Sequence, residues 1–239
     1  MVLPGWFQKS VIRRKTERRN NMDLFPLWNS LRIAAVASIL VFFAGIWAAH
    51  EVAKIPAALR GILDILLTLP LVLPPTVCGF FILQIFGVRH PLGQLLGRWG
   101  IRFVMNWPGG VLAAFVVAFP LMYRTARGAF QSFDKTYQWS GQTLGLSDTY
   151  IFWHIRMPVC RQGIIAGAVL SFARALGEYG ATSMVIGYTP KKTATIATTV
   201  YQLWRTGDNK GATEWVLVNL AISACVLLIL NLSEGRSSK

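Results

Sequence analysis

The sequence predicts an all-α membrane protein with five transmembrane helices. The chain has 239 residues, of which 54% are hydrophobic and only 14% are charged, whereas soluble domains are about one quarter charged. The apolar residues are gathered in five runs, and a helix needs roughly 20 apolar residues to cross the hydrocarbon. Backbone polar groups in lipid must bond within their own segment, so these runs are expected to be helices and not open strands.

The five predicted spans differ in regularity, and the second is the most unusual. They are expected at residues 30–49, 62–86, 109–123, 164–186 and 215–232. The second run contains Pro70, Pro74 and Pro75. Proline removes a backbone donor and leaves carbonyls unpaired, and such groups in a membrane need partners from protein or cavity water. We therefore expect this span to be kinked and to face the interior of the bundle.

Charge indicates how the chain is oriented in a membrane. The formal net charge is +14, but the basic residues lie between the apolar runs, which leaves no soluble basic domain to bind nucleic acid. Loop 124–162 carries five basic residues against Asp134 and Asp148. By the positive-inside rule this loop is cytoplasmic. Counting spans from it places the N-terminus outside and the C-terminus inside.

The first 21 residues conflict with that orientation, because they form a basic extension that favours the inside. They are too charged for a further span and lack the apolar core of a signal peptide. We interpret Met22 as the true start and residues 1–21 as an upstream translation artefact; the alternative is a basic tail on the outside. The expected organisation is then a transmembrane domain over 22–232 and a short C-terminal tail over 233–239.

Loop 124–162 contains the pattern of a helix–glycine turn–helix hairpin. Gly145 can end one short helix with a positive φ angle, and Ser147 can cap the next by accepting a backbone N–H. Ile151 and Ile155 follow at helical spacing, and Pro158 helps to end the second helix. From the residues alone, a plain interfacial hairpin that packs on the bundle is the favoured alternative to a partner-binding hairpin.

This loop resembles the coupling motif in permeases of importers driven by ATP-binding cassettes. The family pattern is Glu-Ala-Ala, three residues, Gly, nine residues, and Ile-x-Leu-Pro. The opening Glu is absent here, and Met stands in place of Leu. The matching positions, which the resemblance identifies as ATPase-coupling residues, are Trp139, Ser140, Gly141, Gly145, Ile155, Met157 and Pro158.

Other segments are similar to molybdate permeases, and the similarity runs from about residue 23 to residue 232. The segments are the Pro-rich stretch 69–80, residues 118–122 and residues 173–182. Sulfate permeases share the loop and a related Gly-Glu-Tyr-Gly segment, so sulfate or thiosulfate is the alternative cargo to molybdate or tungstate. The Pro-rich span favours molybdate or tungstate.

The resemblance also implies a fold and a set of partners. The fold would be that of a type I ABC importer permease with a cytoplasmic coupling hairpin. The chain would work in membrane lipid as a homodimer, with two ATPase subunits below it and a periplasmic or extracellular oxyanion-binding protein above it. ATP and Mg²⁺ would bind the partner ATPase, and this chain would bind no cofactor.

Two groups of residues are candidates for the pathway or gate: Pro74, Pro75 and Thr76 in the second span, and Arg174, Glu178 and Thr182 in the fourth. Arg174 and Glu178 are four residues apart, so they share a helix face and can pair. The alternatives are a kinked structural helix and a structural ion pair.

The outer segment 188–213 carries four cations that could attract an oxyanion or an acidic protein. A solvated loop is the favoured alternative. The cations are Lys191, Lys192, Arg205 and Lys210.

The sequence lacks the motifs of an enzyme. It contains no phosphate-binding loop of the Gly-x-x-x-x-Gly-Lys-Ser/Thr type and no evident nucleophile–base set. The three cysteines and three histidines are scattered, which argues against a metal site. Two other classes stay open. One is a self-contained secondary transporter that uses Glu178 for ion coupling, and the other is a membrane scaffold that transports nothing.

Overall fold

The computed structural model describes residues 23–235, and the side chains of residues 23–228. This part of the chain is helical and contains no β-strand, which confirms that the fold is all-α. The proposed extension 1–21 and the end of the predicted tail lie outside the described residues. Residues 233–235 belong to the last helix and not to a separate tail.

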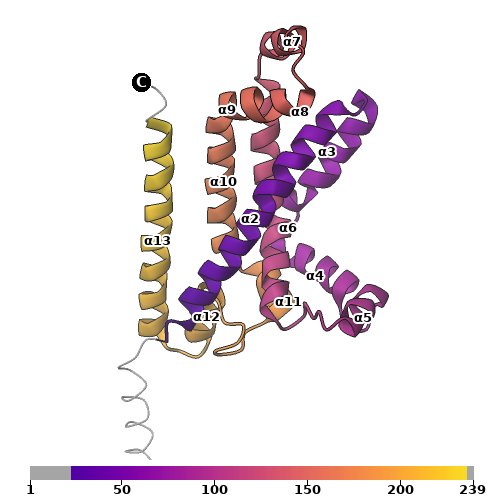
Figure 1. The fold of residues 1–239 in the computed structure, drawn as a ribbon. Coiled ribbons are helices and arrows are strands. Elements are labelled where there is room, and N and C mark those ends of the chain that lie inside the picture. The colour runs from indigo at the N-terminus through magenta and orange to yellow at the C-terminus, as the bar shows by residue number, and fades with distance from the viewer. Residues whose placement is uncertain (1–22, 236–239) are drawn as a thin grey trace, which may run out of the picture.

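Three helices are long and apolar enough to cross a membrane alone: α2 (Phe25–Lys54), α6 (Trp107–Gln131) and α13 (Asn209–Gly235). Each extends beyond the span predicted for it. Helices α2 and α6 lie side by side (Figure 1) through buried alanines and glycine. A Cβ atom on Gly45 would come within 2.6 Å of Met122 Cγ, so the small residue sets the close approach of the two backbones.

The second predicted span is two helices, α3 (Ala57–Val72) and α4 (Pro75–Phe86), which meet at an angle of 113°. Leu73 and Pro74 are extended because a residue before proline avoids the α region, and Pro75 then begins α4 at its first position. The expected kink is therefore a break. The expected interior position holds for α4 and is wrong for α3 in the single chain, because α3 has no fully buried residue. The buried residues of α4 are Cys78, Gly79 and Ile82.

The fourth predicted span is also broken, so the expectation of one helix over 164–186 is wrong. Helix α10 (Arg161–Leu176) ends before Gly177, and α11 (Gly180–Ile186) begins three residues later. A second bend of 74° separates residues 148–159 from α10. The described residues thus contain three clear crossing helices, or up to five if each bent pair makes one span.

Two helices were not expected from the sequence, α5 (Pro91–Arg98) and α12 (Ile196–Arg205). The outer segment is therefore not a simple solvated loop. Two polar side chains of α2 hold it in place: Asn29 Nδ2 donates to Ala194 O at 2.9 Å, and Ser30 Oγ accepts from Ile196 N at 2.8 Å. All of these groups are buried, which fixes the start of α2 against the start of α12.

The molecule has two distinct ends (Figure 1). At the upper end in this view lies a hairpin made of α7 (Lys135–Thr143), α8 (Asp148–Ile151), the π-helix η1 (Phe152–Arg156) and α9 (Met157–Val159). Helix α13 runs up to the same end. Helix α2 begins at the lower end, beside α12.

Candidate functional site

The hairpin is built by local rules that the sequence shows. Asp134 begins α7 by accepting from Thr136 N at 2.8 Å. Gly145 has a φ angle of +77°, as predicted, and lets the chain reverse. Ser147 Oγ accepts from Tyr150 N at 3.3 Å and caps α8, also as predicted. The turn and both caps therefore fix two short arms at a defined angle.

The two arms close on each other through Gly141. A Cβ atom at this position would lie 3.0 Å from Ile151 Cγ1 and 3.5 Å from Ile155 Cδ1, and Ile151 is buried. The outward surface of the hairpin is apolar at two points, because Trp139 is 61% exposed and Leu144 is 78% exposed. Exposed large apolar groups on a short ordered hairpin are typical of a contact surface for another protein.

The second arm of the hairpin is attached to the end of α6. Cys160 Sγ donates to Ala129 O at 3.2 Å, and Arg156 Nη2 donates to Phe130 O at 3.2 Å. The ring centroids of Phe130 and Phe152 are 5.8 Å apart. Met157 packs against the core, whereas Pro158 and Ser140 are exposed. The second arm contains the π-helix η1, a geometry often found at functional sites.

The two segments that carry the candidate gate residues meet where α4 crosses α11. A Cβ atom on Gly180 would lie 2.9 Å from Pro75 Cβ and 3.2 Å from Thr76 N. A Cβ atom on Gly79 would lie 3.0 Å from Ala181 Cα. Two helix breaks that are about 100 residues apart in sequence are thus packed backbone to backbone. Pro74 precedes this contact as the N-cap of α4, and Thr182 is buried in α11.

Glu178 bridges the break between α10 and α11. Arg174 Nη1 donates to Glu178 Oε2 at 2.6 Å, and Ala181 N donates to Glu178 Oε1 at 2.7 Å. The predicted pair is therefore present, and the carboxylate also caps α11. The Glu178 side chain is 1% exposed. Both carboxylate oxygens therefore have a hydrogen-bond partner, one on each side of the break.

The other carboxylate of a predicted span, Asp64, is engaged in the same way. It forms an ion pair with Arg127 and accepts from the hydroxyl of Tyr123, and Arg127 Nη1 also donates to that hydroxyl at 2.9 Å. This network joins α3 to α6.

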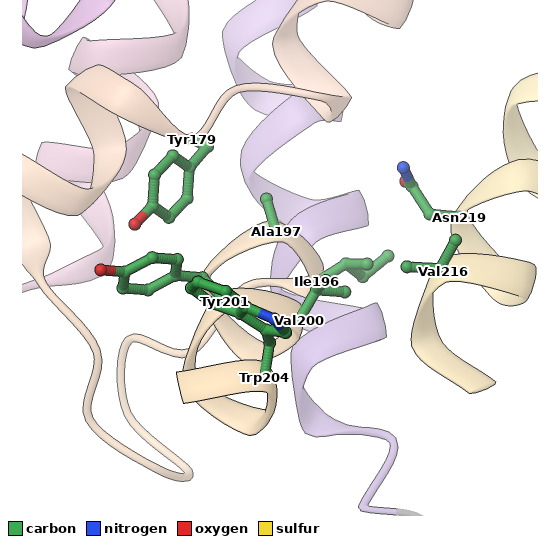
Figure 2. A pocket seen from close by; sticks show the side chains of 8 residues that line it. All are labelled: Tyr179, Ile196, Ala197, Val200, Tyr201, Trp204, Val216 and Asn219. Carbon is green, nitrogen blue, oxygen red and sulfur yellow. The ribbon is translucent and has the colours of Figure 1, made fainter. Parts of the chain in front are cut away.

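A pocket of about 420 Å³ lies between α12 and α13, at the end of the molecule away from the hairpin (Figure 2). Its wall is mainly aromatic and aliphatic, and no cationic side chain lines it. The ring of Tyr179, from the break before α11, lies 5.5 Å from that of Tyr201. Sequence reasoning missed this pocket because its walls come from three separate segments. The lining residues are Tyr179, Ile196, Ala197, Val200, Tyr201, Trp204, Val216 and Asn219.

The four cations of the outer segment, Lys191, Lys192, Arg205 and Lys210, are all exposed. None of them lines the pocket. Within residues 23–235, no group of three or more His, Cys, Asp and Glu side chains is placed to hold a metal ion.

Comparison with known families follows from this architecture. Residues 41–235 match the family described as binding-protein-dependent transport system inner membrane component. The chain belongs to this family. This inner membrane component is a multi-pass, non-catalytic part of its transporter, and the ATPase is a separate subunit.

Its relatives include molybdenum transport proteins of several bacteria. It is 38% identical over 210 residues to the molybdenum transport system permease protein ModB of Escherichia coli K12, covering 85% of this chain and 92% of that protein. It is 33% identical over 212 residues to ModB of Haemophilus influenzae, covering 88% and 91%. A probable sulfate transport system permease protein, cysT of Zygnema circumcarinatum, is 28% identical over 198 residues, covering 83% and 69%.

Solved structures with the same fold include ABC transporters. A bacterial transporter that imports the acidic polysaccharide alginate matches 92% of this chain and 82% of its own, with a TM-score of 0.74 and 16% identity. The methionine transporter MetNI, in an inward-facing conformation, matches 87% and 94%, with a TM-score of 0.65 and 13% identity. At these identities the likeness shows the fold alone.

Proposed function

We propose that the chain is the transmembrane permease subunit of an ATP-driven importer that carries molybdate or tungstate across the cytoplasmic membrane. The observation that carries this proposal is the 38% identity to E. coli ModB over 92% of that protein. Sulfate or thiosulfate is the second candidate, and it has weaker support because the sulfate relative is 28% identical over 69% of its length.

The proposed assembly is a homodimer around a central pathway, with two ATPase subunits at the hairpin end and an oxyanion-binding protein at the other end. The solved alginate importer bound to its periplasmic protein, with a TM-score of 0.73, supports this arrangement of partner types. The same proposal includes five spans, with each bent pair crossing the membrane once. It also includes a cytoplasmic location for the hairpin. Helix α3, unburied in the single chain, supplies surface for lipid or a second copy.

In the proposed mechanism, the hairpin is the handle that the ATPases move. Its first arm presents the exposed Trp139 to the partner, and Gly141 and Gly145 keep the two arms in one rigid unit. Its second arm is attached to α6 through Arg156 and Cys160, so a displacement of the hairpin passes directly to a membrane span.

The crossing of α4 and α11 is proposed as the gate that this displacement opens and closes. Both helices begin at a break in the chain, at Pro74–Pro75 and at Gly177–Tyr179, and residues at the ends of helices can absorb the backbone changes of a hinge motion. The chain supplies a route and a lever and performs no chemistry.

A self-contained secondary transporter is less well supported. Such a mechanism needs a carboxylate that exchanges its partner during transport. Glu178 is fully bonded to Arg174 and Ala181, and Asp64 is bonded to Tyr123 and Arg127. Both arrangements support a structural role for these groups.

The test is transport by the reconstituted complex. The chain is placed in lipid vesicles with its ATPase, with ATP enclosed on the ATPase side and the binding protein on the other. Labelled molybdate is expected to accumulate only with ATP, and a hundredfold excess of sulfate is expected to leave most of this uptake in place. Equal uptake without ATP would refute the ATP-driven importer, and complete competition by sulfate would favour the sulfate alternative.

A further inference from the structure

A small cavity of about 40 Å³ lies near the hairpin end of the molecule, between α2, α3, α6 and η1. Three arginines from different elements converge on it: Arg60 of α3, Arg127 of α6 and Arg156 of η1. Ala49 and Ala53 of α2 complete the wall and leave the space open. One water needs about 10–15 Å³ of such volume, so the cavity has room for roughly three waters or one small anion.

The charges around this cavity are not balanced. Arg127 is paired with Asp64. Within the part of the chain that the structure describes, neither Arg60 nor Arg156 has a carboxylate within ion-pairing distance. Three guanidinium groups therefore face one carboxylate, in a site that is partly shielded from water.

Two donors at the cavity also lack acceptors. Arg60 Nε and Arg156 Nε are buried nitrogen atoms without a hydrogen-bond partner. Arg156 Nη2 donates to Phe130 O, and the guanidinium lies 4.8 Å from the ring of Phe130 and 5.5 Å from that of Phe133. Buried charged donors without acceptors are costly, and each one in a folded protein calls for a partner.

The usual explanation for such arginines is that they are solvated groups that only fix membrane orientation. Arg124, which lies on the same helix as Arg127, fits that explanation because its side chain is exposed. The three cavity arginines differ from it in being half-buried and in meeting from three elements. Guanidinium groups bind tetrahedral oxyanions through paired donors of fixed geometry.

We propose that Arg60, Arg127 and Arg156 form a binding site for a tetrahedral oxyanion group, either a free anion of the sulfate and molybdate class or the headgroup phosphate of a lipid. A bound anion would neutralise the excess charge and satisfy the two open donors. It would also join the hairpin to α3 and α6, because Arg156 lies in the hairpin. The site rests on the proposed function only in the choice of molybdate as one probe.

The test uses the full permease–ATPase complex in detergent, with labelled sulfate and labelled molybdate as probes. The informative variant is Arg60→Gln, and the matched control is Arg124→Gln, which removes the same charge from an exposed site. Loss of one charge-assisted contact is expected to weaken saturable binding about tenfold, whereas the control is expected to stay within twofold of wild type. Arg60→Lys keeps the charge and is expected to fall between the two.

A lipid source is distinguished by native mass spectrometry of the same samples. If a headgroup fills the site, an anionic phospholipid stays bound to wild type and Arg124→Gln and is lost from Arg60→Gln, and free sulfate binds wild type only after lipid removal. The proposal is overturned if Arg60→Gln and wild type bind anion and lipid alike, or if wild type binds neither. Should Arg60→Gln fail to assemble, Arg60→Lys and Arg156→Gln give the same comparison.

Failure of this site and failure of the proposed function give different results. Binding that is indifferent to Arg60 while vesicles take up molybdate refutes the site alone. Binding that depends on Arg60 while vesicles take up no molybdate refutes the transport proposal alone.

Discussion

Arg174 and Glu178 form an ion pair of 2.6 Å across the end of α10, and the same carboxylate caps α11 through Ala181 N. The Glu178 side chain thus binds the last turn of α10 through Arg174 and the first turn of α11 through Ala181 N. A polar group in this position stabilises the break, because the backbone donors at the start of α11 have no intrahelical partners.

Substitution of Glu178 by Ala is expected to destabilise the complex strongly. It removes the cap and leaves the Arg174 guanidinium without its anion, and breaking a buried pair of this kind costs about 3 kcal/mol. Glu178→Gln keeps an acceptor for Ala181 N, so its loss should be smaller. Thermal melting followed by tryptophan fluorescence measures both.

The control for this pair is Glu214→Ala, since Glu214 is an exposed carboxylate on α13. It should melt with wild type. If Glu178→Ala also melted at the wild-type temperature, the ion pair and the cap would contribute nothing to stability. A transport role for the carboxylate would then gain support.

Close packing of α4 on α11 predicts that alanine is poorly tolerated at Gly180 and well tolerated at Gly177. Gly180→Ala would place a Cβ only 2.9 Å from Pro75 Cβ, and overpacking of this kind costs about 1–3 kcal/mol. Gly177→Ala meets only Ala173 O at 3.6 Å and has an ordinary φ angle of −83°. The rate of molybdate uptake and the melting temperature should both fall in Gly180→Ala and stay at the wild-type level in Gly177→Ala. Equal values in the two variants would show that α4 and α11 are not closely packed at Gly180.

These breaks show where the sequence was informative and where it was not. The hairpin could be predicted, because Gly145 and Ser147 act through their nearest neighbours along the chain. The Pro74–Pro75 pair gave a clear local signal for a kink, but the 113° angle depends on packing against α11, which is remote in sequence. The break at Gly177 was missed because apolar residues lie on both sides of it, and only the fold shows that Glu178 accepts from Ala181 N at the start of α11.

The arginine cavity shows the same limit more strongly. Arg60, Arg127 and Arg156 are far apart in sequence, and each looks like an ordinary loop or helix-end cation by the positive-inside rule. Only the packing of α3, α6 and η1 brings them together. The short helices α5 and α12 were missed for a different reason, since they are too short and too polar to stand out among membrane spans.

The start of α7 should respond to pH. Asp134 lies in the loop after α6, and its pKa is lowered because the carboxylate accepts the backbone N–H of Thr136. A lowered pKa stabilises the folded loop above the unfolded value, near pH 3.9, and this contribution is lost as pH falls through the lower folded value. The protection of the first amides of α7, which is the intrinsic exchange rate divided by the observed rate, should therefore fall in acid.

In Asp134→Asn, the amide oxygen still caps α7 but carries no charge. Exchange at the same amides should then be nearly independent of pH once the intrinsic rate is divided out. A variant that kept the wild-type pH dependence would show that another group titrates there.

Replacement of Gly145 in the hairpin turn by alanine should destabilise the hairpin. Gly145→Ala places an L side chain at a φ angle of +77°, which costs about 1–2 kcal/mol. Gly128→Ala, in an open helical position of α6, should instead stabilise by about 0.4–1 kcal/mol. If the hairpin is the ATPase contact, Gly145→Ala should also lower the ratio of molybdate transported to ATP hydrolysed, whereas Gly128→Ala should not.

The orientation of the hairpin can be measured directly by cysteine labelling in intact cells. The exposed Cys225 is first replaced by Ser, and Cys78 and Cys160 are buried. A reporter at Leu144→Cys, where the native side chain is 78% exposed, should resist a membrane-impermeant maleimide until the cells are opened. Lys192→Cys at the opposite end should react in intact cells. Labelling of Leu144→Cys from outside would reverse the topology, and the hairpin could then not contact a cytoplasmic ATPase.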